Sequence, residues 1–170
     1  GSTNPAAAYG NGAGEFLTNV QPVAQGFAIS SAGWDYNMVR WLERLQFNVG
    51  YVTNVDVHRS PARLQNTNVF LSSGHDEYWS WQMRANVEAA RNTGVNLAFF
   101  SANTAYWQIR FEASPATAIP DRVIAGYKLA TADPFFTDGD ATNDRYVTVR
   151  FRDAPVSLPE EPLIGSQYFD

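Results

Sequence analysis

The segment Ser72-Ser-Gly-His-Asp-Glu-Tyr-Trp79 is the densest group of chemically useful side chains in the chain. An imidazole and two carboxylates follow a glycine directly, between a short apolar run and a predicted helix. The ordinary pKa of histidine lies near neutral pH, so His75 suits general acid–base chemistry. Glu77 is two residues further on, and in a tight turn its carboxylate can share a site with His75. The alternative is that Asp76 and Glu77 only stabilise the start of the following helix.

The segment matches none of the common catalytic motifs. No second histidine lies one helical turn from His75, which excludes HExxH, and both serines precede the glycine, which excludes the GxSxG nucleophile turn. The chain has no cysteine, so thiol nucleophiles and thiolate metal sites are excluded. The other histidine, His58, lies in a polar stretch and is interpreted as a structural or rim residue. Lys128 is the only lysine and therefore the only side-chain amine.

A second polar turn, Ser101-Ala-Asn103, follows the apolar run 95–100. The run before His75 covers Val69–Leu71, and both runs are short and continuous, as in buried parallel strands. The carboxyl ends of parallel strands share one edge of a sheet, where ligands bind. We therefore expect His75, Glu77 and Asn103 to converge on one cleft.

The remaining pattern predicts alternating strands and helices. Asp35 precedes a run with apolar residues at helical spacing, and Gly94 is a plausible helix stop. This alternation favours an α/β three-layer sandwich with a mostly parallel central sheet, in which the strands at 69–71 and 97–100 are adjacent in the middle. The expected helices are 35–45 and 78–93, with Trp81, Val87 and Ala90 inward, and the other expected strands are 47–53, 122–129 and 145–152.

Composition limits the classes of protein that fit. The chain has 170 residues, 45% of them apolar and 17% charged, which is typical of one ordered domain. The net charge is −5, and no basic run exists for nucleic acid. No apolar stretch is long enough to span a membrane, and no signal peptide is visible. We expect an irregular segment over 1–33 and one α/β domain over 34–170, as a fragment of a longer protein with other domains. The compartment is left open.

Six segments together resemble the N,N-dimethylformamidase large (beta) subunit-like domain. The resemblance is close over residues 34–130 and looser elsewhere. It rests on Trp34-Asp-Tyr36, Val39-Arg-Trp-Leu-Glu43, Tyr51-Val-Thr-Asn-Val-Asp-Val-His58, Gly74-His-Asp-Glu-Tyr-Trp-Ser80, Asn96-Leu-Ala-Phe-Phe-Ser-Ala-Asn103 and Tyr106-Trp107.

The resemblance implies a flavodoxin-like, class I glutamine amidotransferase-like fold and hydrolysis of an amide. It also implies a mononuclear ferric ion, Fe(III), held by two tyrosines and the glutamate of a His-x-Glu motif. That glutamate matches Glu77, and one tyrosine matches Tyr36, which can also be read as a core ring. By the same resemblance His75, Asn103 and Lys128 are active-site residues. The second tyrosine is not assigned, although Tyr9 lies upstream.

Two functions from different classes follow. The first is a hydrolase of amide-like or other small polar substrates, with metal at Glu77 and Tyr36 and with His75 as acid and base. Carboxylate and phenolate oxygens suit a hard cation, and an open coordination position would polarise a carbonyl. The second is a non-catalytic module that binds a saccharide or another polar ligand through its many Trp and Tyr rings.

Overall fold

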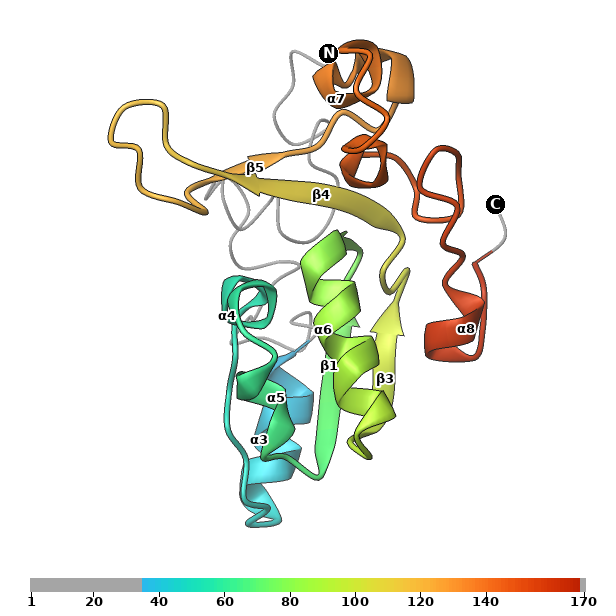
Figure 1. Cartoon of the computed structure of the whole chain (residues 1–170). Helices are drawn as coiled ribbons and strands as arrows, with labels where there is room; N and C mark the ends of the chain where they lie inside the picture. Colours follow the sequence, from blue (N-terminus) through green and yellow to red (C-terminus); the bar gives the residue numbers. More distant parts are fainter. Residues whose placement is uncertain (1–34, 169–170) are drawn as a thin grey trace.

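The computed structural model describes residues 35–168, whose arrangement is shown in Figure 1. No helix in this part of the chain is long and apolar enough to cross a membrane. The irregular segment expected over 1–33 lies outside the described residues. In chain order the elements are α3 (Tyr36–Arg44), α4 (Asn54–Arg59), α5 (Ala62–Gln65), β1 (Val69–His75), β2 (Tyr78–Ser80), α6 (Trp81–Asn92), β3 (Asn96–Ala102), β4 (Trp107–Glu112), β5 (Val123–Ala125), the 3-10 turn η1 (Ala130–Ala132), α7 (Pro134–Thr137), the 3-10 turn η2 (Asp144–Tyr146) and α8 (Glu161–Ile164).

The two apolar runs expected to be adjacent strands form a parallel pair. β1 pairs with β3 along its whole length, and His75 lies opposite Ala102 at the carboxyl end. Side chains alternate between the faces of a strand, so Phe70 and Leu97 share one face, and both pack against the buried core. In the view of Figure 1, α6 runs in front of β1 and beside β3, roughly along the direction of the strands. The adjacency and the parallel direction were therefore predicted correctly.

The second sheet is built from β2, β4 and β5. β2 pairs with β4 in parallel, and β4 pairs with β5 in the antiparallel direction. The helix predicted from Tyr78 starts only at Trp81, because the three buried residues of β2 precede it. Ser80 ends the strand and caps the helix, since its Oγ accepts a hydrogen bond from the Met83 N–H at 3.1 Å.

α6 buries a stripe of small and medium apolar residues. Met83, Val87 and Ala90 follow helical spacing and are at most 2% exposed. The prediction placed Trp81 inward as well, but this ring is only half-buried and packs edge-on against Tyr146. The chain leaves the helix through Gly94, whose φ of +102° favours glycine, as the sequence predicted.

The expected three-layer sandwich with one central, mostly parallel sheet is not what the described residues form. Residues 35–168 make a mixed α/β structure with a two-stranded parallel sheet and a three-stranded mixed sheet. The strand predicted at 47–53 is irregular, with Phe47 and Tyr51 more than half exposed. The strand at 122–129 shortens to β5, and that at 145–152 contributes only a bridge between Arg150 and Trp107.

Two arginines of α6 attach the C-terminal part of the chain to the core. Arg84 is 3% exposed and donates hydrogen bonds to the Leu158 and Pro159 carbonyls at 2.6 and 2.8 Å. Arg91 lies two turns further along the helix and donates to the Pro162 carbonyl at 2.9 Å. These contacts hold α8 beside β3 (Figure 1).

Candidate active site

The candidate site is built on the turn that joins β1 to β2. Gly74 has a φ of +78°, which lets the strand bend directly before His75. The Asp76 N–H donates a hydrogen bond to Ser101 Oγ at 2.9 Å, so the turn is fastened to the end of β3. The Glu77 carbonyl accepts from the Tyr106 and Trp107 N–H groups at 3.1 and 2.9 Å, which fastens its other end to the start of β4.

His75 and Glu77 face each other across this turn. The distance from His75 Nδ1 to Glu77 Oε2 is 3.4 Å, and the two side chains are only 14% and 11% exposed. Burial raises the pKa of the Glu77 carboxyl above its ordinary value, although the Lys128 ammonium and the polar groups of Trp107 and Asn103 act in the opposite direction. The carboxylate is thus enclosed, with a cation and donors near it.

Asn103 lies at the end of β3, as predicted, in a left-handed conformation with a φ of +49°. Asparagine tolerates this region better than most residues, because its short polar side chain bonds locally. Its amide acts on the Glu77 carboxylate, so the ends of β1 and β3 do bring these residues together. The sequence-predicted convergence of His75, Glu77 and Asn103 therefore holds as geometry, and their chemical roles stay predictions.

Lys128 reaches the same place from the segment after β5. Its Nζ donates a hydrogen bond to Tyr78 Oη at 2.8 Å and lies 4.9 Å from the centre of the Trp107 ring. Desolvation lowers the pKa of this amine, while the charge of Glu77 raises it. The sequence did not indicate Tyr78 and Trp107 as site residues, although Tyr78 directly follows Glu77 and Tyr106-Trp107 is one of the six segments that carry the resemblance.

Asp76 points into different surroundings. Its Oδ2 accepts a hydrogen bond from Ser72 Oγ at 2.7 Å, and burial raises the pKa of the carboxyl to about 6. Neither Asp76 nor Glu77 stabilises the start of α6, because that helix begins at Trp81 and has no acidic residue in its first turn. The interpretation of both carboxylates as helix-start residues is therefore wrong.

Tyr36 is the first residue of α3, and its neighbour in the chain, Asp35, contacts β1. The preceding residue, Asp35, occupies the N-cap position without capping the helix, and its Oδ1 accepts a hydrogen bond from Ser73 Oγ at 2.6 Å instead. This places the start of α3 beside β1, two residues before His75. No hydrogen bond or ion pair joins Tyr36 to Glu77 within residues 35–168, and Tyr9 lies outside that range.

Of the residues expected to hold a ferric ion, Glu77 and Tyr36 both lie within the described part of the chain. Glu77 offers an enclosed carboxylate, the kind of ligand that suits a hard cation. Residues 35–168 hold no group of three or more His, Asp or Glu that could bind a metal ion. A site of two phenols and one carboxylate is a different kind of group, and a metal at Glu77 and Tyr36 stays a prediction.

His58 has a structural environment, one of the two interpretations that the sequence left open. Its Nδ1 lies 2.8 Å from Ser80 Oγ, and its Nε2 lies 3.6 Å from Asp121 Oδ1. This order of groups resembles a hydrolytic triad, but Ser80 is fully buried and caps α6. The serine cannot reach a substrate there, and desolvation lowers the pKa of the imidazole.

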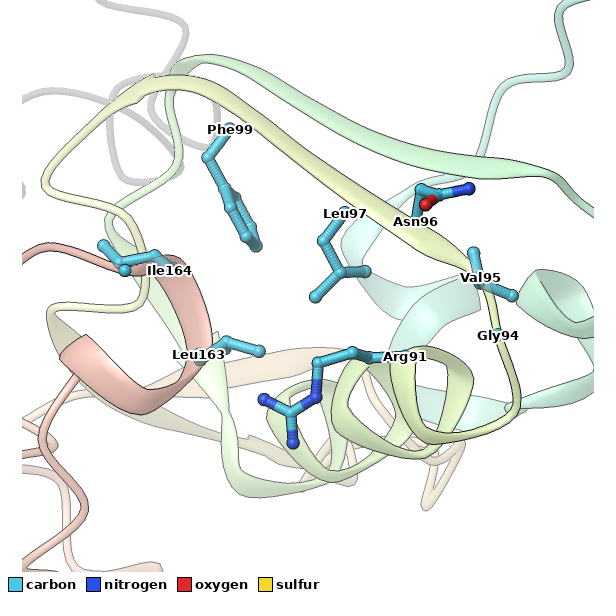
Figure 2. Close-up of a pocket in the computed structure, with 9 residues that line it drawn as sticks. Arg91, Gly94, Val95, Asn96, Leu97, Phe99, Leu163 and Ile164 are labelled. Atoms are coloured by element: carbon cyan, nitrogen blue, oxygen red, sulfur yellow. The ribbon is translucent and has the colours of Figure 1, made fainter.

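Two hollows flank β3, and only one of them reaches the candidate site. A shallow groove of about 450 Å³ lies between α6, the start of β3 and α8, and Figure 2 shows Leu97, Leu163 and Arg91 around it. It contains none of the predicted site residues. A smaller hollow of about 270 Å³ is bordered by Ser101 and Asn103 at the end of β3 and by residues 166–168.

One family model matches the chain. A family model described as N,N-dimethylformamidase beta subunit-like, C-terminal, matches residues 3–170, which is nearly the whole chain and includes every site residue named above. A comparison with curated proteins gives no match.

Proposed function

The chain belongs to the N,N-dimethylformamidase beta subunit-like C-terminal family, and from that premise we propose that it hydrolyses an amide-like or other small polar substrate at the Glu77 site. The observation that supports this most is the meeting of four different groups where β1, β3 and the segment after β5 come together. An imidazole, a carboxylate, an amide and an ammonium group surround one point. Such a combination of acid, base and electrostatic groups is what acyl transfer requires.

In this proposal His75 is the general base. Glu77 orients the imidazole through the 3.4 Å contact with Nδ1 and stabilises the imidazolium that forms when His75 removes a proton from the attacking water. The oxygen of that water bonds to the carbonyl carbon, and the carbonyl oxygen becomes an oxyanion. The Lys128 ammonium and the Asn103 amide stabilise this oxyanion, and His75 then returns the proton to the leaving nitrogen as the C–N bond breaks.

The resemblance also implies a ferric ion bound through Glu77, and the chemistry that such an ion supplies when bound is polarisation of the substrate carbonyl. Its second tyrosine ligand is not assigned, and no step above passes through the ion. The proposed roles of His75, Asn103 and Lys128 require only that they contact the substrate or the reacting water.

Turnover of small amides tests the proposal. The full chain is incubated with formamides and acetamides of increasing size, and release of the amine and the acid is measured. We expect Glu77→Gln and His75→Asn to lower kcat roughly 10²- to 10⁴-fold, the usual contribution of acid–base catalysis. Because burial raises the pKa of Glu77, activity should fall on the acid side at a pH above the ordinary range of a glutamate.

The matched control is Glu161→Gln, on the exposed surface of α8, which should keep full activity. Hydrolysis that survives Glu77→Gln unchanged would overturn the proposed site. Stoichiometric binding of a saccharide or an amide without turnover would favour the binding-module function instead.

A further inference from the structure

The position of Lys128 is fixed first by its backbone. Its φ is +62°, in the left-handed region that residues other than glycine rarely adopt. Two hydrogen bonds hold the chain there: the Lys128 N–H donates to the Thr148 carbonyl, and the Tyr127 N–H donates to Thr148 Oγ1, both at 2.8 Å. Thr148 is itself fully buried, so the root of the lysine side chain is anchored to the core. A strained backbone held this firmly is typical of functional sites.

The far end of the side chain is held by a different part of the fold. Tyr78 and Trp107 lie opposite each other on β2 and β4, and Nζ contacts both residues. Tyr78 is 8% exposed, so its ring has little freedom. Its hydroxyl oxygen accepts a hydrogen bond from Nζ at 2.8 Å, and the Trp107 ring offers a favourable face to the ammonium group.

Chain connectivity ties this arrangement to Glu77. Tyr78 immediately follows Glu77, and the Glu77 carbonyl accepts from the Trp107 N–H at 2.9 Å. Tyr78 and Trp107, which hold the amine, are thus both joined to the Glu77 backbone, Tyr78 by a peptide bond and Trp107 by a hydrogen bond. The amine itself lies near the Glu77 carboxylate. A lysine side chain carries its ammonium group on a flexible stem of four carbons, so without these contacts it would be free to turn into solvent.

We propose that Tyr78 is a positioning residue: its hydroxyl holds the Lys128 amine next to Glu77 and so fixes the only side-chain ammonium group available to the site. Its catalytic consequence rests on the proposed function, because Tyr78 acts on the reaction only through Lys128. The positioning itself is independent of any activity and can be measured without a substrate.

The chain offers an unusually direct experiment, because Lys128 is its only lysine. The full chain is treated with an amine-acylating reagent, and modification of the peptide that contains Lys128 is followed by mass spectrometry. The test variant is Tyr78→Phe, which keeps the ring and removes the hydroxyl. The control is Tyr127→Phe, the same change next to Lys128, at a tyrosine whose hydroxyl is not bonded to the amine. Thermal unfolding of each variant checks its fold.

We expect Tyr78→Phe to raise the rate of modification of Lys128 about fivefold, the effect of losing one ordinary hydrogen bond, and Tyr127→Phe to leave it unchanged. Equal rates in the wild type and in Tyr78→Phe would overturn the proposal. If Tyr78→Phe does not fold, the wild type still decides: its lysine ε-methylene should show a nuclear Overhauser effect to the Tyr78 ring, and the lack of one refutes the positioning.

Kinetics separate the two proposals. If the wild type hydrolyses amides, Tyr78→Phe should lower kcat more than it changes KM, and Lys128→Met should remove the effect of the hydroxyl. If the wild type hydrolyses nothing, a faster modification of Lys128 in Tyr78→Phe than in the wild type would uphold the positioning and contradict the hydrolase.

Discussion

Asp76 and Glu77 are consecutive carboxylates with different surroundings. Glu77 lies beside an imidazole and an ammonium group, whereas Asp76 is enclosed and accepts a hydrogen bond from the Ser72 hydroxyl. Desolvation without a compensating cation favours the protonated acid, which is why the pKa of Asp76 rises to about 6. Of these two carboxylates, Glu77 lies at the candidate site, whereas Asp76 bonds within the β1–β2 turn.

Asp76→Asn should stabilise the fold at neutral pH. The raised pKa means that the folded chain binds more protons than the unfolded chain between about pH 4 and 6, so Asp76 contributes stability below pH 4 that is lost as the pH rises through about 6. An asparagine still accepts the Ser72 hydrogen bond and carries no charge at any pH. We expect the free energy of unfolding at pH 7.5 to increase by about 1–3 kcal/mol.

Urea unfolding between pH 4 and 7.5 checks this prediction. The other titrating residues are the same in both proteins, so the difference in the free energy of unfolding between Asp76→Asn and the wild type reports on Asp76 alone. Glu161→Gln, at an exposed position, is the control and should leave the pH dependence unchanged. A variant that is less stable than the wild type at pH 7.5, but equally stable at pH 4, would show that the ionised form of Asp76 supports the fold.

At the scale of single residues, the sequence predicted the part of the site that depends on strand ends. His75 and Asn103 end neighbouring parallel strands, and that relation is visible in two short apolar runs. The contribution of Tyr78 was hidden because it reads as the first turn of a helix. It becomes visible only once β2 is known to pair with β4. The sequence showed Lys128 as a unique amine, but only the strained turn after β5 places it at Glu77.

At the scale of elements, the sequence pattern predicted a helix correctly, because a helix forms its backbone hydrogen bonds within itself. It predicted strands wrongly where strand formation depends on a partner strand elsewhere in the chain. α6 has helical spacing, a capping serine and a terminal glycine, all of which are local signals. The stretches 47–53 and 145–152 have strand-like composition but lack a ladder of partners among the described residues. In the second stretch, the Thr148 N–H donates to Asp133 Oδ2 at 2.7 Å in place of a neighbouring strand.

Asp133 is one of the residues that fasten this irregular stretch to β4. It is fully buried, accepts two hydrogen bonds from Arg110 Nη1 and binds both the N–H and the hydroxyl of Thr148. Asp133→Asn would remove the buried counter-charge of the Arg110 guanidinium, on β4, and leave it only the Glu112 carboxylate, whose side chain is 42% exposed. We expect a loss of about 3–5 kcal/mol in the free energy of unfolding, measured by chemical denaturation.

The matched control is a second aspartate–arginine pair at the surface. Arg150 Nε and Asp153 Oδ2 are 2.8 Å apart, but the two side chains are 31% and 38% exposed. Asp153→Asn should cost less than about 1 kcal/mol, because solvent screens the pair. Equal losses in the two variants would mean that burial of Asp133 does not determine its contribution.

At the scale of the whole molecule, the family match extends beyond the part that the structure describes. It begins at residue 3, so the segment before α3 belongs to the matched region and contains Tyr9. Glu77 and Tyr36, the two residues predicted to hold the metal, lie within the described part of the chain, and the second tyrosine is not assigned.

Iron binding is accordingly predicted for the entire chain and not for the Glu77 turn alone. We propose that the protein, expressed with ample iron and purified without a nickel column, contains about one iron atom per chain, as the resemblance implies. A tyrosine phenol has an ordinary pKa of about 10, so it binds iron at neutral pH as a phenolate that the metal stabilises, and such a bond absorbs visible light. Glu77→Gln should lower the iron content and bleach this absorption, whereas Glu161→Gln should keep both. Elemental analysis and a visible spectrum decide the matter independently of activity. A colourless, iron-free wild type that still hydrolyses amides would leave His75, Glu77, Asn103 and Lys128 to carry the reaction without a metal.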